Sequence, residues 1–144
     1  MKALAALFLV VAVGVQGCAA GRACSDVGDF NGVGVEIPRA LFVESGSVAI
    51  DVCDTDGCAS AVQRLGPVPE GPVGRAANVS FDDLGRHFEP GQVTVTVKVA
   101  SSDGQLVAAA RHEIELMRSY PNGMSCDGDG YVNGSLRLNA RDRV

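Results

Sequence analysis

Apolar and polar residues alternate strictly along one stretch of the chain, and this pattern constrains the fold more than any other feature. Every second residue of segment 93–99 is valine, and two threonines and a lysine lie between the valines. Successive side chains of a β-strand point to opposite faces, so the segment predicts a strand with one buried and one exposed face. Such a strand has to bury its apolar face against another layer of the same domain.

Comparable patterns recur along the chain, and turn-forming residues separate them. The segments with strand-like patterns are 33–37, 48–53, 59–65, 77–81, 93–99, 105–117 and 132–140. Residues 105–117 also have apolar residues at helical spacing, but the Ser-Asp-Gly turn before them favours a hairpin partner for 93–99. Residues 82–88 fit a single helical turn. We therefore predict an all-β chain of about seven short strands.

Two packed antiparallel sheets bury such alternating faces most readily. Segment 89–106 contains a Pro-Gly turn, a Val-x-Val-x-Val strand and a Ser-Asp-Gly hairpin, and it resembles the late strands of immunoglobulin-like and fibronectin-like modules. The resemblance implies an antiparallel β-sandwich for residues 24–144, although the chain has no tryptophan for the Cys–Trp–Cys signature of immunoglobulin domains. With Tyr-Pro-Asn-Gly at 120–123 before a late cysteine, the chain is also similar to uncharacterised exported proteins of actinobacteria.

The first 17 residues have the pattern of an export signal. Lys2 precedes the uncharged apolar segment 3–15, which is thirteen residues long. A membrane-spanning helix needs about 20 residues, whereas a short apolar segment after one basic residue is typical of a secretory signal. We therefore exclude residues 1–17 from the folded domain.

The end of this segment resembles the lipobox of bacterial lipoproteins. Val15 and Gly17 match the lipobox before Cys18, and Gln16 departs from its usual residue. The resemblance implies removal of the signal peptide, acylation of Cys18 and anchoring of the exported protein to the outer face of the cell membrane. Residues 18–23 would then form a short tether. The alternatives are ordinary secretion, with cleavage near Gly17, Ala19 or Ala23, and an apolar segment that stays uncleaved as an anchor.

The five cysteines fit this division of the chain. They are Cys18, Cys24, Cys53, Cys58 and Cys126. If Cys18 carries lipid, four remain, and export makes disulfides the expected state. Four cysteines allow three connectivities. Four turn-forming residues separate Cys53 from Cys58 between two strand-like segments, which favours a Cys53–Cys58 bond on the outer side of a hairpin and leaves Cys24–Cys126.

Composition argues against several classes of partner. The formal net charge is −5, so we expect no nucleic-acid partner. Aromatic residues make up only 5% of the chain, and surfaces that stack on sugars or bases usually need more.

The sequence also lacks a complete metal motif. The pairs Asp54/Asp56 and Asp127/Asp129 resemble fragments of calcium loops, but neither has the bidentate Glu at the twelfth position. Aspartate and glycine are also favoured turn residues, which is our interpretation of both pairs. No Cys-x-x-Cys pair suggests zinc. We expect no bound metal and no other cofactor.

No arrangement of residues predicts catalysis either. The chain has two histidines, His87 and His112, and no Gly-x-Ser-x-Gly motif. His112 falls on the apolar face of 105–117, as a core or sheet-edge histidine would. Asp82 and Asp83 are interpreted as the start of a helical turn rather than a catalytic pair. We expect that the protein is not an enzyme.

Three hypotheses follow for function. The first is a membrane-anchored, non-catalytic β-sandwich that binds an envelope protein or glycan through loops or a sheet edge. The second is a structural or accessory envelope protein without a ligand, and the third is a secreted enzyme or ion-binding protein. An unpaired edge strand would favour the first hypothesis. Covered edges and uniformly polar faces would favour the second, and a pocket that gathers the histidines would favour the third. The sequence leaves the oligomeric state open.

Overall fold

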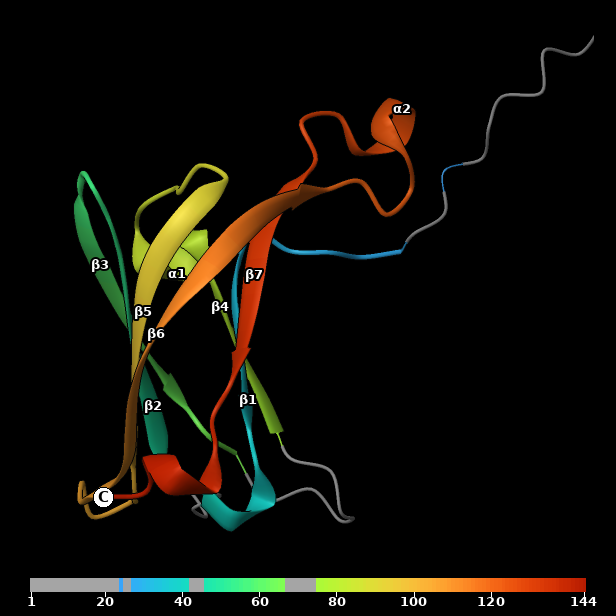
Figure 1. The fold of residues 1–144 in the computed structure, drawn as a ribbon. Coiled ribbons are helices and arrows are strands. Elements are labelled where there is room, and N and C mark those ends of the chain that lie inside the picture. The colour runs from blue at the N-terminus through green and yellow to red at the C-terminus, as the bar shows by residue number, and fades with distance from the viewer. Residues whose placement is uncertain (1–23, 25–26, 42–45, 67–74) are drawn as a thin grey trace, which may run out of the picture.

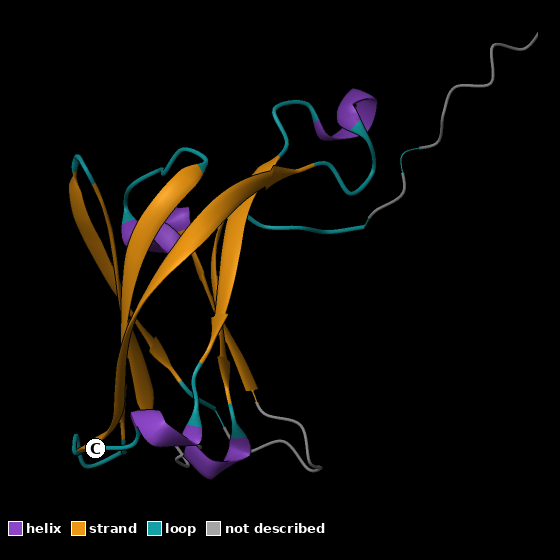
Figure 2. Cartoon of the chain, in the orientation of Figure 1, coloured by secondary structure: helices purple, strands orange, loops and turns teal. Residues whose placement is uncertain are grey.

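The computed structural model describes residues 24, 27–41, 46–66 and 75–144. Seven strands make up most of this part of the chain, and short helical turns join some of them (Figure 1, Figure 2). The strands are β1 (Gly32–Ile37), β2 (Ser47–Asp54), β3 (Gly57–Arg64), β4 (Arg75–Ser80), β5 (Gly91–Ala100), β6 (Leu106–Ser119) and β7 (Tyr131–Arg137). The helical turns are α1 (Phe81–Leu84), α2 (Met124–Asp127) and the 3-10 turns η1 (Arg39–Leu41) and η2 (Ala140–Asp142).

All seven strands belong to one mixed sheet in the order β3-β2-β5-β6-β7-β1-β4. Five neighbouring pairs are antiparallel, whereas β1 and β7 run parallel. The expectation of a wholly antiparallel arrangement is therefore wrong at this pair. Side-chain alternation has the same period in both kinds of pairing, so it does not specify the direction of a neighbouring strand.

Strand β6 joins the two halves of the sheet. Its first part pairs with β5, and only Met117–Ser119 pairs with β7, so β6 leans across from one half to the other (Figure 1). Gly134 of β7 permits the close approach of the two strands where they diverge, because a Cβ atom there would lie 2.9 Å from a methyl carbon of Leu116. The sheet consequently curls into a nearly barrel-shaped structure whose two edges are β3 and β4.

The core lies inside this curved sheet. The valines of 93–99 are all buried, as the alternation predicted, and they pack with apolar residues from β1, β2, β4 and β7. Phe81 of α1 adds to the same core and lies 5.3 Å from Phe88, measured between ring centroids. Within the described part of the chain, no charged or polar residue is buried as a whole. Burial of apolar area is therefore the main stabilising contribution to this fold.

The other predicted elements agree with the structure in type, and they differ at some ends. Segment 105–117 is a strand, and the helical turn expected within 82–88 is α1. The last strand ends at Arg137 rather than at residue 140, because Asn139 and Asp142 form a reciprocal capping interaction around η2. Ala140, which was expected on the inner face, is consequently exposed.

Candidate functional site

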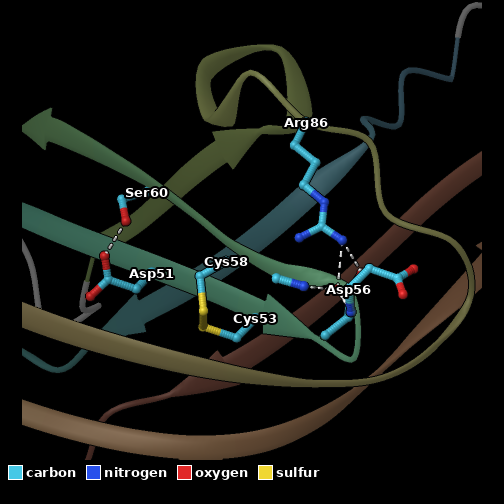
Figure 3. The surroundings of a disulfide bond; sticks show 8 residues. Asp51, Cys53, Asp56, Cys58, Ser60 and Arg86 are labelled. Carbon is cyan, nitrogen blue, oxygen red and sulfur yellow. Dashed lines mark hydrogen bonds and ion pairs between the residues drawn. A yellow bond between two sulfur atoms is a disulfide. The ribbon is translucent and has the colours of Figure 1, made fainter.

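The feature that stands out for function is the hairpin of β2 and β3, which includes an edge of the sheet. Cys53 and Cys58 lie opposite each other in the hairpin and form the expected disulfide, with 4.0 Å between their Cα atoms. The disulfide lies on the outer face of the hairpin, as predicted, and Cys58 is exposed (Figure 3). On the same face, the hydroxyl of Ser60 donates a hydrogen bond of 2.5 Å to Asp51.

The position of this disulfide reveals which way the backbone groups of β3 point. In an antiparallel pair, opposed residues with close Cα atoms belong to the non-hydrogen-bonded set. Cys58 is such a residue, so the backbone groups of its odd-numbered neighbours in β3 bond to β2. The even-numbered residues of β3 direct their N–H and C=O groups away from β2. The bond from Leu65 N–H to the Gly46 carbonyl, 2.8 Å, has the same phase.

The outward groups of β3 belong to Cys58, Ser60, Val62 and Arg64, all of which are exposed. In the described part of the chain, β2 is the only strand that pairs with β3. Val62 is 71% exposed, although it is apolar. A hollow of about 470 Å³ separates this edge from β4 and α1, and its lining includes Val62 and Asp83. Parts of α1 and β4 come within 8 Å of β3, measured between Cα atoms, and the hollow lies between them and the edge. Strand β3 therefore offers hydrogen-bonding groups that no other described strand uses, and such an edge can pair with an added strand.

The tip of the hairpin is held in place by an ion pair from a distant part of the chain. Arg86, which follows α1, donates hydrogen bonds of 2.6 and 2.7 Å to the two carboxylate oxygens of Asp54. Its guanidinium carbon also lies 4.6 Å from the ring centroid of Phe88. The Asp54 carboxylate accepts two more bonds from the N–H groups of Asp56 and Gly57. These contacts fix the end of the edge strand relative to the core.

The same contacts change the acidity of Asp54. Desolvation acts to raise the pKa of this carboxyl, whereas the hydrogen bond from Arg86 and those from the backbone act to lower it. The lowering effects are larger together, so the pKa lies below its ordinary value.

A second cluster fastens the beginning of the domain to the loop after β6. Cys24 is bonded to Cys126 with 5.6 Å between the Cα atoms, as expected from the sequence. Asn122 exchanges two hydrogen bonds with the backbone of Val27 and donates a third, 2.9 Å long, to Asp127. This arrangement joins two segments that are about 100 residues apart and explains Asp127 as a structural residue.

Asp29 continues this cluster into the sheet. Its carboxylate accepts hydrogen bonds from the Ser119 hydroxyl, 2.5 Å, and from the Asn133 amide, 2.9 Å. Desolvation acts to raise the pKa of the Asp29 carboxyl. The hydrogen bonds from Ser119, the Phe30 backbone and Asn133 act to lower it, and together they have the larger effect, so the pKa lies below its ordinary value. These polar residues position the entry into β1 beside β7.

The outer face of β4, β1 and β7 has a wide hollow of about 690 Å³. Gly34 forms part of its floor, and Asn78 and Ser135 flank it. At its rim, Arg137 and Glu36 form an ion pair of 3.4 Å between exposed side chains. The hollow is open and its polar groups are few, so we assign no chemistry to it.

The aspartates of the two calcium-like fragments have structural partners in the described part of the chain. No group of three or more metal-binding side chains occurs there. Asp54 is occupied by the turn and by Arg86, as described above. Asp83 forms a reciprocal capping box with Ser80 at the start of α1, so the interpretation of Asp82 and Asp83 as a helix start is confirmed.

The two histidines occupy different environments. His87 is exposed in the loop after α1, and its Nε2 lies 3.9 Å from a carboxylate oxygen of Asp82. His112 is on the inward face of β6, as expected, but its buried Nε2 has no hydrogen-bond partner among the described residues. The structure therefore does not bring the two histidines together into one site.

Cys18, the signal segment 1–17 and the tether 18–23 lie outside the described residues. No helix within the described part of the chain has the length and apolar character needed to cross a membrane. Sequence reasoning did not identify Arg86 or the free edge of β3. One signal was present: Val62 lies in the outward phase of its strand, where a solvent-facing strand usually has a polar residue.

Comparison with known proteins adds no relative: no protein-family model, no curated protein and no solved structure matches this chain.

Proposed function

We propose that the protein is a non-catalytic binding module of the cell envelope, which binds a protein partner by adding a strand to the free edge of β3. The observation that carries this proposal is the outward set of backbone groups at Ser60 and Val62. An added strand satisfies such groups through main-chain hydrogen bonds, and side chains of the edge provide selectivity. An edge that is exposed, apolar at Val62 and unpaired within the described chain favours binding over a purely structural role.

The rigidity of the hairpin supports the same role. The disulfide Cys53–Cys58 and the Arg86–Asp54 pair hold the edge strand in an extended form before any partner arrives. Preorganisation of this kind reduces the entropy lost on binding. For the fold itself, we propose an immunoglobulin-like or fibronectin-like relationship. Its support is the pair of half-sheets around one core, β3-β2-β5-β6 and β6-β7-β1-β4.

We further propose that the module is exported and anchored through an acylated Cys18. Two disulfides in a domain of this size suit an oxidising compartment outside the cytoplasm. Intact mass of the protein made in a bacterial host tests the anchor. The protein should begin at Cys18 and carry acyl mass, and the variant Cys18→Ser should lose it. A wild-type protein that is cleaved elsewhere and carries no lipid would support simple secretion instead.

Site-specific crosslinking tests the binding role. A photoreactive amino acid at position 62 should capture a partner in living cells, because this position lies at the free edge. The matched control is position 117, where Met117 is 63% exposed but lies where β6 pairs with β7. Equal capture at both positions, or no reproducible capture at position 62, would contradict the proposal.

A further inference from the structure

We propose that the partner of the β3 edge is a second copy of this chain, paired antiparallel about a two-fold axis at Ser60. This inference rests on the proposed binding role of the same edge and names its occupant. Pairing would join the sheets of two copies, β3 against β3, into one continuous sheet.

The phase of the hydrogen bonds permits this pairing. The outward N–H and C=O groups belong to the even-numbered residues of β3. A two-fold axis at Ser60 places each even-numbered residue opposite another: Ser60 faces its own copy, and Val62 faces Cys58. Every facing pair then belongs to the set that can exchange two hydrogen bonds. The edge is therefore complementary to itself without any change in its conformation.

Charge selects this alignment over its neighbour. With the axis at Ser60, Arg64 of each copy lies beside the turn residue Asp56 of the other, just before the start of β3, which gives two opposite-charge pairs by symmetry. Both side chains are exposed, and neither has a hydrogen bond or ion pair to a described side chain. With the axis at Ala61, Arg64 would face the uncharged Cys58 instead. Opposite charges across neighbouring strands stabilise the pairing that contains them.

The other edge of the sheet is less suited to the same role. The bond from Phe81 N–H to the Asn31 carbonyl shows that the odd-numbered residues of β4 bond to β1. The backbone N–H and C=O groups that point away from β1 are those of Ala76, Asn78 and Ser80. The N–H of Ser80 already donates to the carboxylate of Asp83. Strand β3 thus offers the longer free edge, and its exposed apolar side chain, Val62, is larger than that of Ala76 on β4.

The first test is the mass of the oxidised protein in solution. We expect its weight-average mass to rise with concentration toward twice the monomer mass in sedimentation equilibrium. Val62→Pro should weaken association at least about tenfold, because it removes an outward N–H and leaves the bonds to β2 intact. Val62→Ala, which keeps the N–H, is the matched control and should associate more strongly than the proline variant. Circular dichroism checks that each variant is folded.

Charge exchange tests the alignment itself. Arg64→Asp and Asp56→Arg should each weaken the dimer by about tenfold, because each brings like charges together twice. The double variant restores opposite charges and should recover wild-type association. Because all variants share the same N-terminal segment, association through that segment would not respond to these changes.

A protein that stays monomeric up to about 1 mM would overturn the inference. So would a dimer that is insensitive to Val62→Pro, or a double charge variant that does not recover association. If a crosslinker at position 62 captures only a different protein while this chain stays monomeric, the second-copy inference fails and the binding role stands. If it captures neither a second copy nor another protein, both fail.

Discussion

Removal of the two disulfides, one at a time, should have very different effects on stability. In the chain-entropy model, a disulfide restricts the unfolded chain more when it closes a longer loop. The sequence separations are 5 for Cys53–Cys58 and 102 for Cys24–Cys126. The model then gives about 2 kcal/mol for the short loop and about 4.7 kcal/mol for the long one at 25 °C.

Native contacts should change little in either case. Without its disulfide, the hairpin keeps the backbone pairing of β2 with β3 and the bonds of Asp54 to Arg86. Without the other disulfide, Asn122 still bonds to Val27. We therefore expect the difference of about 2.7 kcal/mol to come mainly from the unfolded state.

The assay is equilibrium urea unfolding of the wild type and of two double variants, Cys53→Ser/Cys58→Ser and Cys24→Ser/Cys126→Ser. Each variant keeps Cys18 and the other disulfide. The unfolding slope m should increase when a disulfide is removed, and more for the long loop, because the unfolded chain becomes less compact. If the hairpin variant loses as much stability as the long-loop variant, the entropic reasoning is wrong and local strain or packing dominates.

Three further substitutions test individual contacts. His112→Leu should raise the free energy of unfolding by about 1 kcal/mol, because the buried Nε2 has no partner among the described residues; a loss in urea unfolding would contradict this. Gly46→Ala should lower the free energy of unfolding by about 1–3 kcal/mol, because the new Cβ would lie 2.2 Å from a backbone carbonyl oxygen. The matched control is Gly28→Ala, whose Cβ would meet nothing within 4 Å and which should change that free energy by less than about 0.5 kcal/mol. Arg86→Gln should raise the pKa of Asp54 in an NMR titration. Because the pKa of Asp54 is lower in the folded than in the unfolded protein, the carboxylate stabilises the fold above the unfolded pKa, and this stabilisation is lost as pH falls through the folded pKa. The Arg86→Gln variant should therefore lose less stability on acidification than the wild type. An unchanged pKa of Asp54 would refute the role of Arg86.

Local patterns in the sequence determined the strands and the disulfides. The alternation in 93–99 predicted β5 and its buried face, because a period of two residues is a property of the strand itself. The pairing of Cys53 with Cys58 followed from a short turn between two strands. Ser80 and Asp83 likewise meet within one helical turn, so the start of α1 could be recognised from neighbouring residues.

Tertiary structure alone decided how the two predicted hairpins and the other strands are ordered in the sheet, and which edge is free. The parallel contact of β1 with β7 and the crossing of β6 join segments that are distant in sequence, and alternation carries no information about direction or partner. The contact of Arg86 with Asp54 spans 32 residues and depends on where α1 lies relative to the hairpin. Whether β3 is a central or an edge strand depends on the closure of the whole sheet, so the free groups at Ser60 and Val62 became visible only in three dimensions.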